Sequence, residues 1–357
     1  MILLNPGPVN VSARVTAALA RGDLCHREPE CNDLLTRIRT QLTRAFAPRG
    51  EFTAVLLTGS GTAALEAAVN SVLSPAGRLV VVANGVYGER IAAMAEAARL
   101  PHTVVAGEWT APPDLAVLER AVQEPGVEAV AVVHHETTTG LLNPVAQVGA
   151  IARRHGKLLL IDSISGLAGD ALDFDAVGAD LVVGTANKCI QGLPGIAFVL
   201  VREPVMARLA TYPRRSLYLS LGVHHEAALR GSTPFTPAVQ IAYALDEALA
   251  ELLEEGVDAR VARYAAAAAQ LRAGFTALGL ELVLPPPLRS NSITTLFLPP
   301  RRSYAVLHDE LKRRGFVIYE GQGKLQRAVF RVANMGALGH DDFARFLDAL
   351  GDVLRCA

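Results

Sequence analysis

Cysteine, aromatic side chains and net charge are all scarce in this chain. Only four cysteines occur among the 357 residues, and no two have the C-x-x-C spacing of a zinc or redox site. Few cysteines in a chain with a large apolar core favour a reducing, cytosolic environment. Aromatic residues make up 5%, which argues against a base-stacking surface for single-stranded nucleic acid. Lys and Arg total 34 against 35 Asp and Glu, so the chain lacks the broad positive field of a non-specific nucleic-acid binder.

Long apolar runs are absent too. No run reaches the ~18 residues of a membrane span, and the first residues lack the basic start and apolar core of a signal peptide. We therefore expect a cytoplasmic protein with neither membrane nor nucleic-acid partners. The chain is nevertheless 51% hydrophobic and 19% charged, which is too apolar for a disordered chain. At roughly 100–200 residues per domain, its length suggests about two domains.

Between residues 54 and 200 the sequence alternates apolar, β-branched runs with amphipathic stretches. The runs are 54–58, 79–83, 129–133, 158–162, 181–184 and 196–201, and the helical patterns are 62–72, 90–99, 113–123 and 144–155. This alternation predicts an α/β fold with a mostly parallel sheet, whose sites lie at the carboxyl ends of the strands.

After Pro237 the pattern changes. Helices are predicted at 241–253, 257–278, 304–314 and 341–354, with strands near 293–298, 316–319 and 328–332. We expect a large α/β domain over residues 15–250 and a smaller α+β domain over 251–357, with residues 1–14 packing near the site.

Two candidate site features follow strands of the predicted sheet. The turn 58–62 (Thr-Gly-Ser-Gly-Thr) lies between a strand and a helix, where free N–H groups and the helix dipole bind phosphate. It is neither a Walker loop nor a complete G-x-G-x-x-G motif, and an ordinary helix cap explains it equally well. Asp162 ends an apolar strand, so its carboxylate is suited to a ribose, a metal or a cationic ring nitrogen, or simply caps the next segment.

Two basic residues complete the set. Lys188 follows the run 181–184, and an amine held in a partly desolvated site becomes a nucleophile, although most single lysines are solvated. Arg331 lies within an apolar strand pattern, where its fork matches a carboxylate or phosphonate unless it faces solvent from an edge strand. Together the four features suit a ligand with a phosphate, a carbonyl and a cationic ring nitrogen. Pyridoxal 5′-phosphate has all three.

At this point the sequence resembles a known family almost from end to end. It is similar to the class V, fold type I pyridoxal-phosphate aminotransferases, and within them most like the enzymes that use 2-aminoethylphosphonate and pyruvate. The stretches that carry the resemblance are 4–8, 57–62, 83–90, 135–140, 186–195 (Ala-Asn-Lys-Cys-Ile-Gln-Gly-Leu-Pro-Gly) and 330–332.

The resemblance implies a role for each matching residue. Lys188 carries the cofactor and moves the proton, while Asp162 pairs with the pyridine nitrogen. Arg331 binds the substrate's carboxylate. The phosphate is held by Ser60, Gly61 and Thr62. Tyr87 stacks on the cofactor ring, and the Thr137 hydroxyl approaches its 3′ oxygen. Thr236 reaches the phosphate of the partner subunit in a homodimer. No metal is expected.

Some residues depart from this pattern and leave alternatives open. His26-Arg27 resembles the serine– or alanine–glyoxylate aminotransferases, and Gly166 stands where relatives have a serine near the substrate. A glyoxylate aminotransferase is therefore the main alternative. A desulfurase or lyase needs a reactive cysteine, but Cys189 beside the lysine is better explained by packing. A nicotinamide-dependent dehydrogenase lacks its glycine motif, and a non-catalytic binding module has no need of both Lys188 and Asp162.

Overall fold

A seven-stranded sheet forms the centre of the molecule in the computed structural model, which describes residues 1–300 and 302–355. Its strand order is β2-β10-β9-β8-β5-β3-β4. Strand β10 runs in the direction opposite to that of the other six strands. The predicted mostly parallel α/β architecture is therefore confirmed. The strands are β2 (Phe52–Gly59), β3 (Arg78–Ala83), β4 (His102–Ala106), β5 (Val127–Val133), β8 (Leu158–Asp162), β9 (Leu181–Thr185) and β10 (Gly195–Arg202).

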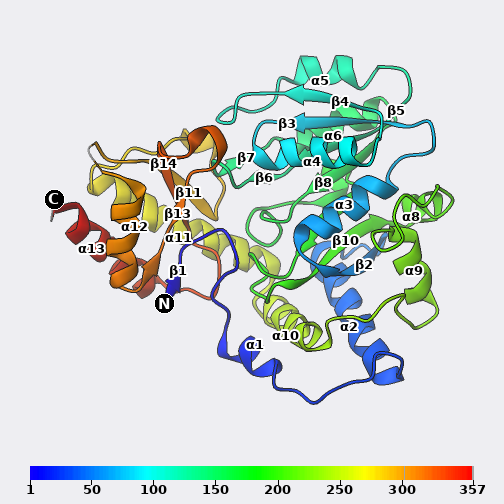
Figure 1. Cartoon of the computed structure of the whole chain (residues 1–357), viewed down its shortest axis with the longest axis horizontal. Helices are drawn as coiled ribbons and strands as arrows, with labels where there is room; N and C mark the ends of the chain where they lie inside the picture. The colour runs from blue at the N-terminus through cyan, green and yellow to red at the C-terminus, as the bar shows by residue number, and fades with distance from the viewer. Residues whose placement is uncertain (301, 356–357) are drawn as a thin grey trace.

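Helices cover both faces of this sheet (Figure 1). Alternate residues of one strand enter different cores: Val80 and Val82 of β3 pack on one face, and Leu79 and Val81 pack on the other. The first face is covered by α2 (Pro29–Phe46), α5 (Leu115–Ala121), α6 (Val145–Arg154) and α10 (Val239–Glu255). The second face is covered by α3 (Gly61–Ser71), α4 (Val86–Ala97) and α8 (Glu203–Leu209), with the start of α9 (Leu221–Leu229). Burial on both faces explains why the central strands read as continuous apolar runs.

The C-terminal elements build a separate apolar core beside the large sheet. They are α11 (Val257–Ala277), β11 (Ile293–Phe297), α12 (Tyr304–Arg313), β12 (Phe316–Val317), β13 (Tyr319–Glu320), β14 (Val329–Ala333) and α13 (His340–Arg355), and we call them the C-terminal unit. Tyr264 near the start of α11 packs in the core of the large sheet, whereas Phe275 near its end packs in the C-terminal core. Helix α11 thus belongs to both cores, and Figure 1 shows it between the two parts.

The N-terminus joins the C-terminal unit rather than the large sheet. Strand β1 (Ile2–Leu3) pairs in parallel with β12, so that Ile2 lies opposite Phe316. The short elements that complete the chain are α1 (Ala13–Ala18), β6 (His135–Glu136), β7 (Leu141–Leu142), α7 (Phe174–Val177) and the 3-10 turns η1 (Pro286–Leu288) and η2 (Gly323–Leu325). Within the described ranges no helix combines the length and the apolar composition that a membrane span requires.

Several predicted boundaries were wrong. Helix α4 begins at Val86 rather than at residue 90, and the predicted strand 316–319 is split into β12 and β13. Strand β4 was not predicted because it is an edge strand whose side chains are largely half-buried or exposed. Helix α2 was also missed. Cys356, counted among the four cysteines, lies outside the described residues.

Candidate active site

Lys188 lies in a turn that follows β9, at the carboxyl edge of the sheet. It is 9% exposed, which excludes the solvated surface lysine. Its Nζ lies 5.8 Å from the centre of the Tyr87 ring. The turn is closed by the N–H of Gln191, which donates to the Lys188 carbonyl at 2.9 Å. The N-terminal segment contacts the lysine directly, because a Cβ added at Gly7 would lie 3.3 Å from Lys188 Cγ.

Asp162 ends β8 and shares the environment of this lysine. Its carboxylate is 2% exposed and accepts a hydrogen bond from the Ile164 N–H at 3.0 Å. Burial raises the pKa of Asp162 to about 6, while the Ile164 N–H and the charges of Lys188 and Arg90 act in the opposite direction. A buried carboxylate next to a lysine is suited to hold a cationic group that approaches both.

The turn between β2 and α3 forms a cradle of main-chain N–H groups. Ser60 is the N-cap of α3, but its side chain makes no capping hydrogen bond. The first N–H groups of a helix have no partner within the helix, so they remain available to an anion. A Cβ at Gly61 would lie 2.9 Å from Ile164 Cδ1 and 3.0 Å from its Cγ2, so a larger residue here needs the Ile164 side chain to shift. Thr62 Oγ1 accepts a hydrogen bond from Arg90 Nη1 at 3.4 Å.

Tyr87 lies in the first turn of α4, and its ring is close to two cations, Arg90 and Lys188. The guanidinium carbon of Arg90 lies 4.7 Å from the ring centre, one helical turn further along α4. Glu136 holds the start of the helix, since its carboxylate accepts from the N–H of Tyr87 at 3.0 Å and from the N–H of Gly88 at 3.4 Å. Burial raises the pKa of Glu136 to about 7. Sequence reasoning assigned no role to Arg90 or Glu136, although both fall in the stretches that carry the family resemblance.

Thr137 and Arg331 meet although 194 residues separate them. Arg331 Nη1 donates to the Thr137 carbonyl at 2.7 Å, and the whole side chain is buried, which excludes the solvent-facing edge-strand arginine. Burial lowers the pKa of Arg331, but a guanidinium keeps its charge. Thr137 Oγ1 is buried and has no hydrogen-bond partner among the described residues. An unpartnered buried hydroxyl on the residue that Arg331 contacts is available to a polar ligand.

Thr236 is the predicted site residue that the structure does not bring to the others. It is exposed on the segment that precedes α10 and lines a surface groove together with Thr58, Tyr218 and Phe235. The neighbouring Ala238 N–H donates to Thr58 Oγ1 at 3.2 Å. Thr236 therefore lies beside the strand that leads to the phosphate cradle, but on the outside of this chain.

These residues fit pyridoxal phosphate. The uncapped start of α3 suits its phosphate, the buried Asp162 suits a protonated ring nitrogen, and the free Thr137 hydroxyl suits a ring oxygen. Lys188 is the amine within the same site. In the part of the chain that the structure describes, no three His, Cys, Asp or Glu side chains are grouped so as to hold a metal ion.

Comparison with known proteins agrees with this site. Residues 12–335 match the aminotransferase class-V family, so the chain belongs to that family and is a pyridoxal-phosphate-dependent aminotransferase. Over 98% of its length it is 37% identical to 2-aminoethylphosphonate–pyruvate transaminase of Vibrio cholerae, of which it covers 96%.

Two solved structures show the same fold. Pyridoxamine–pyruvate aminotransferase from Mesorhizobium loti is 29% identical with a TM-score of 0.92, and the match covers 100% of this chain and 92% of that one. Alanine–glyoxylate aminotransferase from Nostoc is 26% identical with a TM-score of 0.93, and the match covers 99% of this chain and 95% of that one.

The structure also explains two unusual residues. A Cβ at Gly166 would lie 2.4 Å from His134 Nδ1, so the buried ring of His134 fills the space that a serine side chain needs. Cys189 is buried, and burial raises the pKa of its thiol to about 12. A thiol that stays protonated is a poor nucleophile, so Cys189 does not supply the reactive cysteine of a desulfurase.

Proposed function

We propose that this protein transfers the amino group of 2-aminoethylphosphonate to pyruvate, giving phosphonoacetaldehyde and alanine. The similarity to the Vibrio cholerae transaminase of that name, over nearly the full length of both chains, supports the substrate pair. The observation that carries the chemistry is the burial of Lys188 and Asp162 in one site at the carboxyl edge of the sheet.

Each site residue has a role in this reaction. When bound, pyridoxal phosphate supplies the carbonyl that accepts the amino group and the ring that withdraws electrons from the reacting carbon. Lys188 Nζ holds the cofactor and moves the proton at that carbon. The carboxylate of Asp162 keeps the ring nitrogen protonated. Ser60, Gly61 and Thr62 bind the phosphate, the ring of Tyr87 stacks on the cofactor, and the Thr137 hydroxyl binds the 3′ oxygen.

Arg331 binds the acidic group of both substrates. The phosphonate of the donor and the carboxylate of pyruvate are both anions, so one guanidinium serves the two half-reactions. Its hydrogen bond to the Thr137 carbonyl keeps it next to the cofactor contacts.

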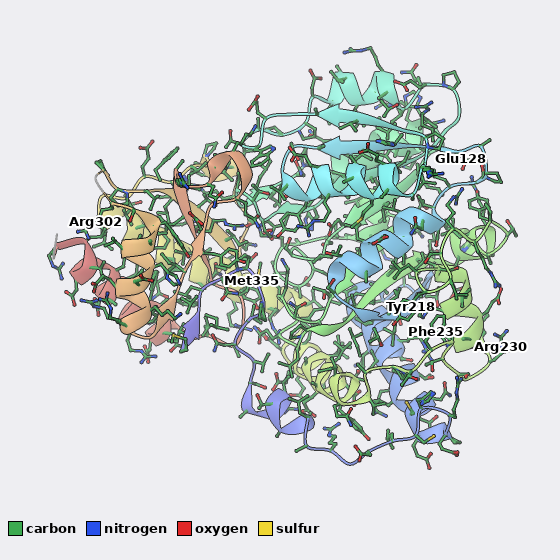
Figure 2. The ribbon with its side chains drawn as sticks, in the orientation of Figure 1. Glu128, Tyr218, Arg230, Phe235, Arg302 and Met335 are labelled. Atoms are coloured by element: carbon green, nitrogen blue, oxygen red, sulfur yellow. The ribbon has the colours of Figure 1, made fainter. Side chains whose placement is uncertain are left out.

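The complete enzyme is proposed to be a cytoplasmic homodimer, each chain with a large domain over residues 15–250 and a small one over 251–357. Thr236 reaches the phosphate bound by the partner subunit. An apolar surface beside this residue supports the proposal: Tyr218 and Phe235 stack with ring centres 4.8 Å apart near α9 (Figure 2), and Leu217 and Leu229 are 77% and 74% exposed. A fully active monomer in sedimentation at assay concentration contradicts this assembly.

A glyoxylate aminotransferase that takes serine or alanine is the second candidate. His26-Arg27 and Gly166 favour it, and the Nostoc alanine–glyoxylate enzyme shares the fold. Arg27 donates to the Thr233 carbonyl at 3.0 Å, so it lies in the same surface region as Thr236.

A matrix of donors and acceptors tests the proposal. The purified holoenzyme is incubated with 2-aminoethylphosphonate, serine, alanine or taurine, each with pyruvate or glyoxylate, and the products are quantified. Phosphonoacetaldehyde and alanine are the expected main products. If serine or alanine with glyoxylate gives the higher turnover, the second candidate is correct.

A further inference from the structure

The guanidinium of Arg331 is almost fully occupied by oxygen atoms of this chain. Nε and Nη2 both donate to the Glu320 carbonyl, at 3.0 and 2.8 Å. Nη1 donates to the Thr137 carbonyl at 2.7 Å and to Oε1 of Gln322 at 3.2 Å. A guanidinium has five N–H donors, so these contacts leave only one of them free. A bidentate pair with a carboxylate or phosphonate needs two.

One of these acceptors is far easier to displace than the others. The Glu320 carbonyl belongs to β13, which is paired with β14, and the Thr137 carbonyl belongs to the tight turn that Gly140 N closes onto Glu136. Both are main-chain groups in fixed structure. Gln322 contributes a side-chain amide, which leaves by rotation of its own side chain.

The main chain around Gln322 is anchored, so the segment need not move. The Gly321 N–H donates to the Val329 carbonyl at 3.1 Å, and Leu325 N–H donates to the Gln322 carbonyl at 3.0 Å. Lys324 Nζ lies 4.8 Å from the Trp109 ring centre and 3.6 Å from Glu108, which links the following turn η2 to the loop after β4.

We propose that Gln322 is a specificity-determining residue. Its amide oxygen accepts from an N–H group of Arg331 that the substrate's acidic group needs, and only an anion displaces it. This inference rests on the proposed function and deepens it. A hydrogen bond from a guanidinium to an anionic oxygen is stronger than one to a neutral amide, so a carboxylate or phosphonate displaces Oε1. A neutral substrate gains no such advantage, and Arg331 then stays bound to its own chain.

The experiment measures anion binding directly and does not depend on turnover. The holoenzyme in its pyridoxal form is titrated with two probes that carry no amino group, pyruvate and methylphosphonate, by calorimetry. Gln322→Glu converts the neutral acceptor into a carboxylate paired with Arg331. We expect it to raise both dissociation constants by ~10-fold or more. Gln322→Ala removes the competitor and is expected to bind both probes at least as tightly as the unaltered enzyme.

A matched control comes from a helix of the large sheet. Gln147→Glu adds the same charge at an exposed position of α6, away from Arg331 and its acceptors, and we expect its dissociation constants to stay within ~2-fold. The cofactor content and absorption spectrum of each variant check that the site is intact.

Two results overturn the inference. In the first, Gln322→Glu binds the probes as tightly as the unaltered enzyme. In the second, Gln322→Ala weakens binding, which means that the amide aids the anion instead of competing with it. Failure of the proposed function can be distinguished from failure of the role given to Gln322. If both probes behave as expected but 2-aminoethylphosphonate donates no amino group, the donor is wrong and the role of Gln322 stands.

Discussion

Replacing Asp162 by Asn is expected to stabilise the cofactor-free protein and to disable the holoenzyme. The carboxylate is 2% exposed, and burial is the main reason for its raised pKa. Asn has nearly the same shape, and its side-chain oxygen still accepts the hydrogen bond that the Ile164 N–H donates at 3.0 Å. The substitution therefore removes the buried charge and little else.

The magnitude follows from the pKa. That of Asp162 rises from 3.8 to about 6, and at about 1.4 kcal/mol for each pH unit the buried charge costs the folded protein about 3 kcal/mol. The folded state holds its proton more tightly than the unfolded state. Stability is therefore lost as the pH rises from the unfolded to the folded pKa, and the loss is complete above about pH 6. Near pH 3 and below, Asp162 is protonated in both the folded and the unfolded state, so its ionisation should no longer make the unaltered protein less stable than Asp162→Asn.

The assay is urea unfolding of the cofactor-free protein near pH 5 and near pH 8. At the higher pH, Asp162→Asn should be more stable than the unaltered protein, by up to about 3 kcal/mol, and the difference should shrink at the lower pH. Asp348→Asn is the matched control. Asp348 is exposed on α13, so its replacement should change stability by less than about 0.5 kcal/mol at either pH.

In the holoenzyme the same substitution is expected to be harmful. Asp162→Asn should still bind the cofactor, but turnover should fall by orders of magnitude because the ring nitrogen loses its anionic partner. A cofactor-free variant that is less stable than the unaltered protein near pH 8 would refute the burial argument. Near-normal turnover would remove Asp162 from the mechanism.

Three further predictions follow from the site. Borohydride reduction of the holoenzyme should fix the cofactor to the single peptide that contains Lys188; label on another lysine ends that assignment. Arg331→Lys should weaken both half-reactions because it loses the bidentate fork, and Arg331→Ala should weaken them more; an effect on one half-reaction alone contradicts a shared anion site. Gly166→Ser should destabilise the protein by about 1–3 kcal/mol, since its Cβ meets the His134 ring. Gly22→Ser, with no atom within 4 Å of the added Cβ, should be neutral in the same thermal unfolding assay.

Local sequence pattern was sufficient wherever the strands are buried on both faces. The apolar run that ends at Asp162 coincides with β8, and β9 ends three residues before Lys188. Because parallel strands end at one edge of the sheet, the pattern alone indicated that both residues lie there. It left the environment of Arg331 open, because only the pairing of β14 between β11 and β13 determines that this strand is central and buried.

Features that depend on tertiary contacts were not predictable. Helix α4 begins at Val86 because Glu136, about 50 residues further along the chain, accepts the hydrogen bonds of its first turn. No local pattern contains that cap. Gln322 resembles any polar loop residue until β13 brings it to Arg331. The role of Thr236 stays a prediction, since it depends on a second subunit.

A single-turnover comparison of amino donors tests the central claim most directly. The pyridoxal form of the enzyme is mixed with 2-aminoethylphosphonate, serine or alanine, and the loss of its absorbance, roughly 410–430 nm for this cofactor, is followed over time. The proposed function predicts that 2-aminoethylphosphonate discharges the cofactor with the highest rate at limiting concentration. If serine or alanine discharges it with a far higher value, the protein is a glyoxylate-type aminotransferase and the phosphonate assignment is wrong.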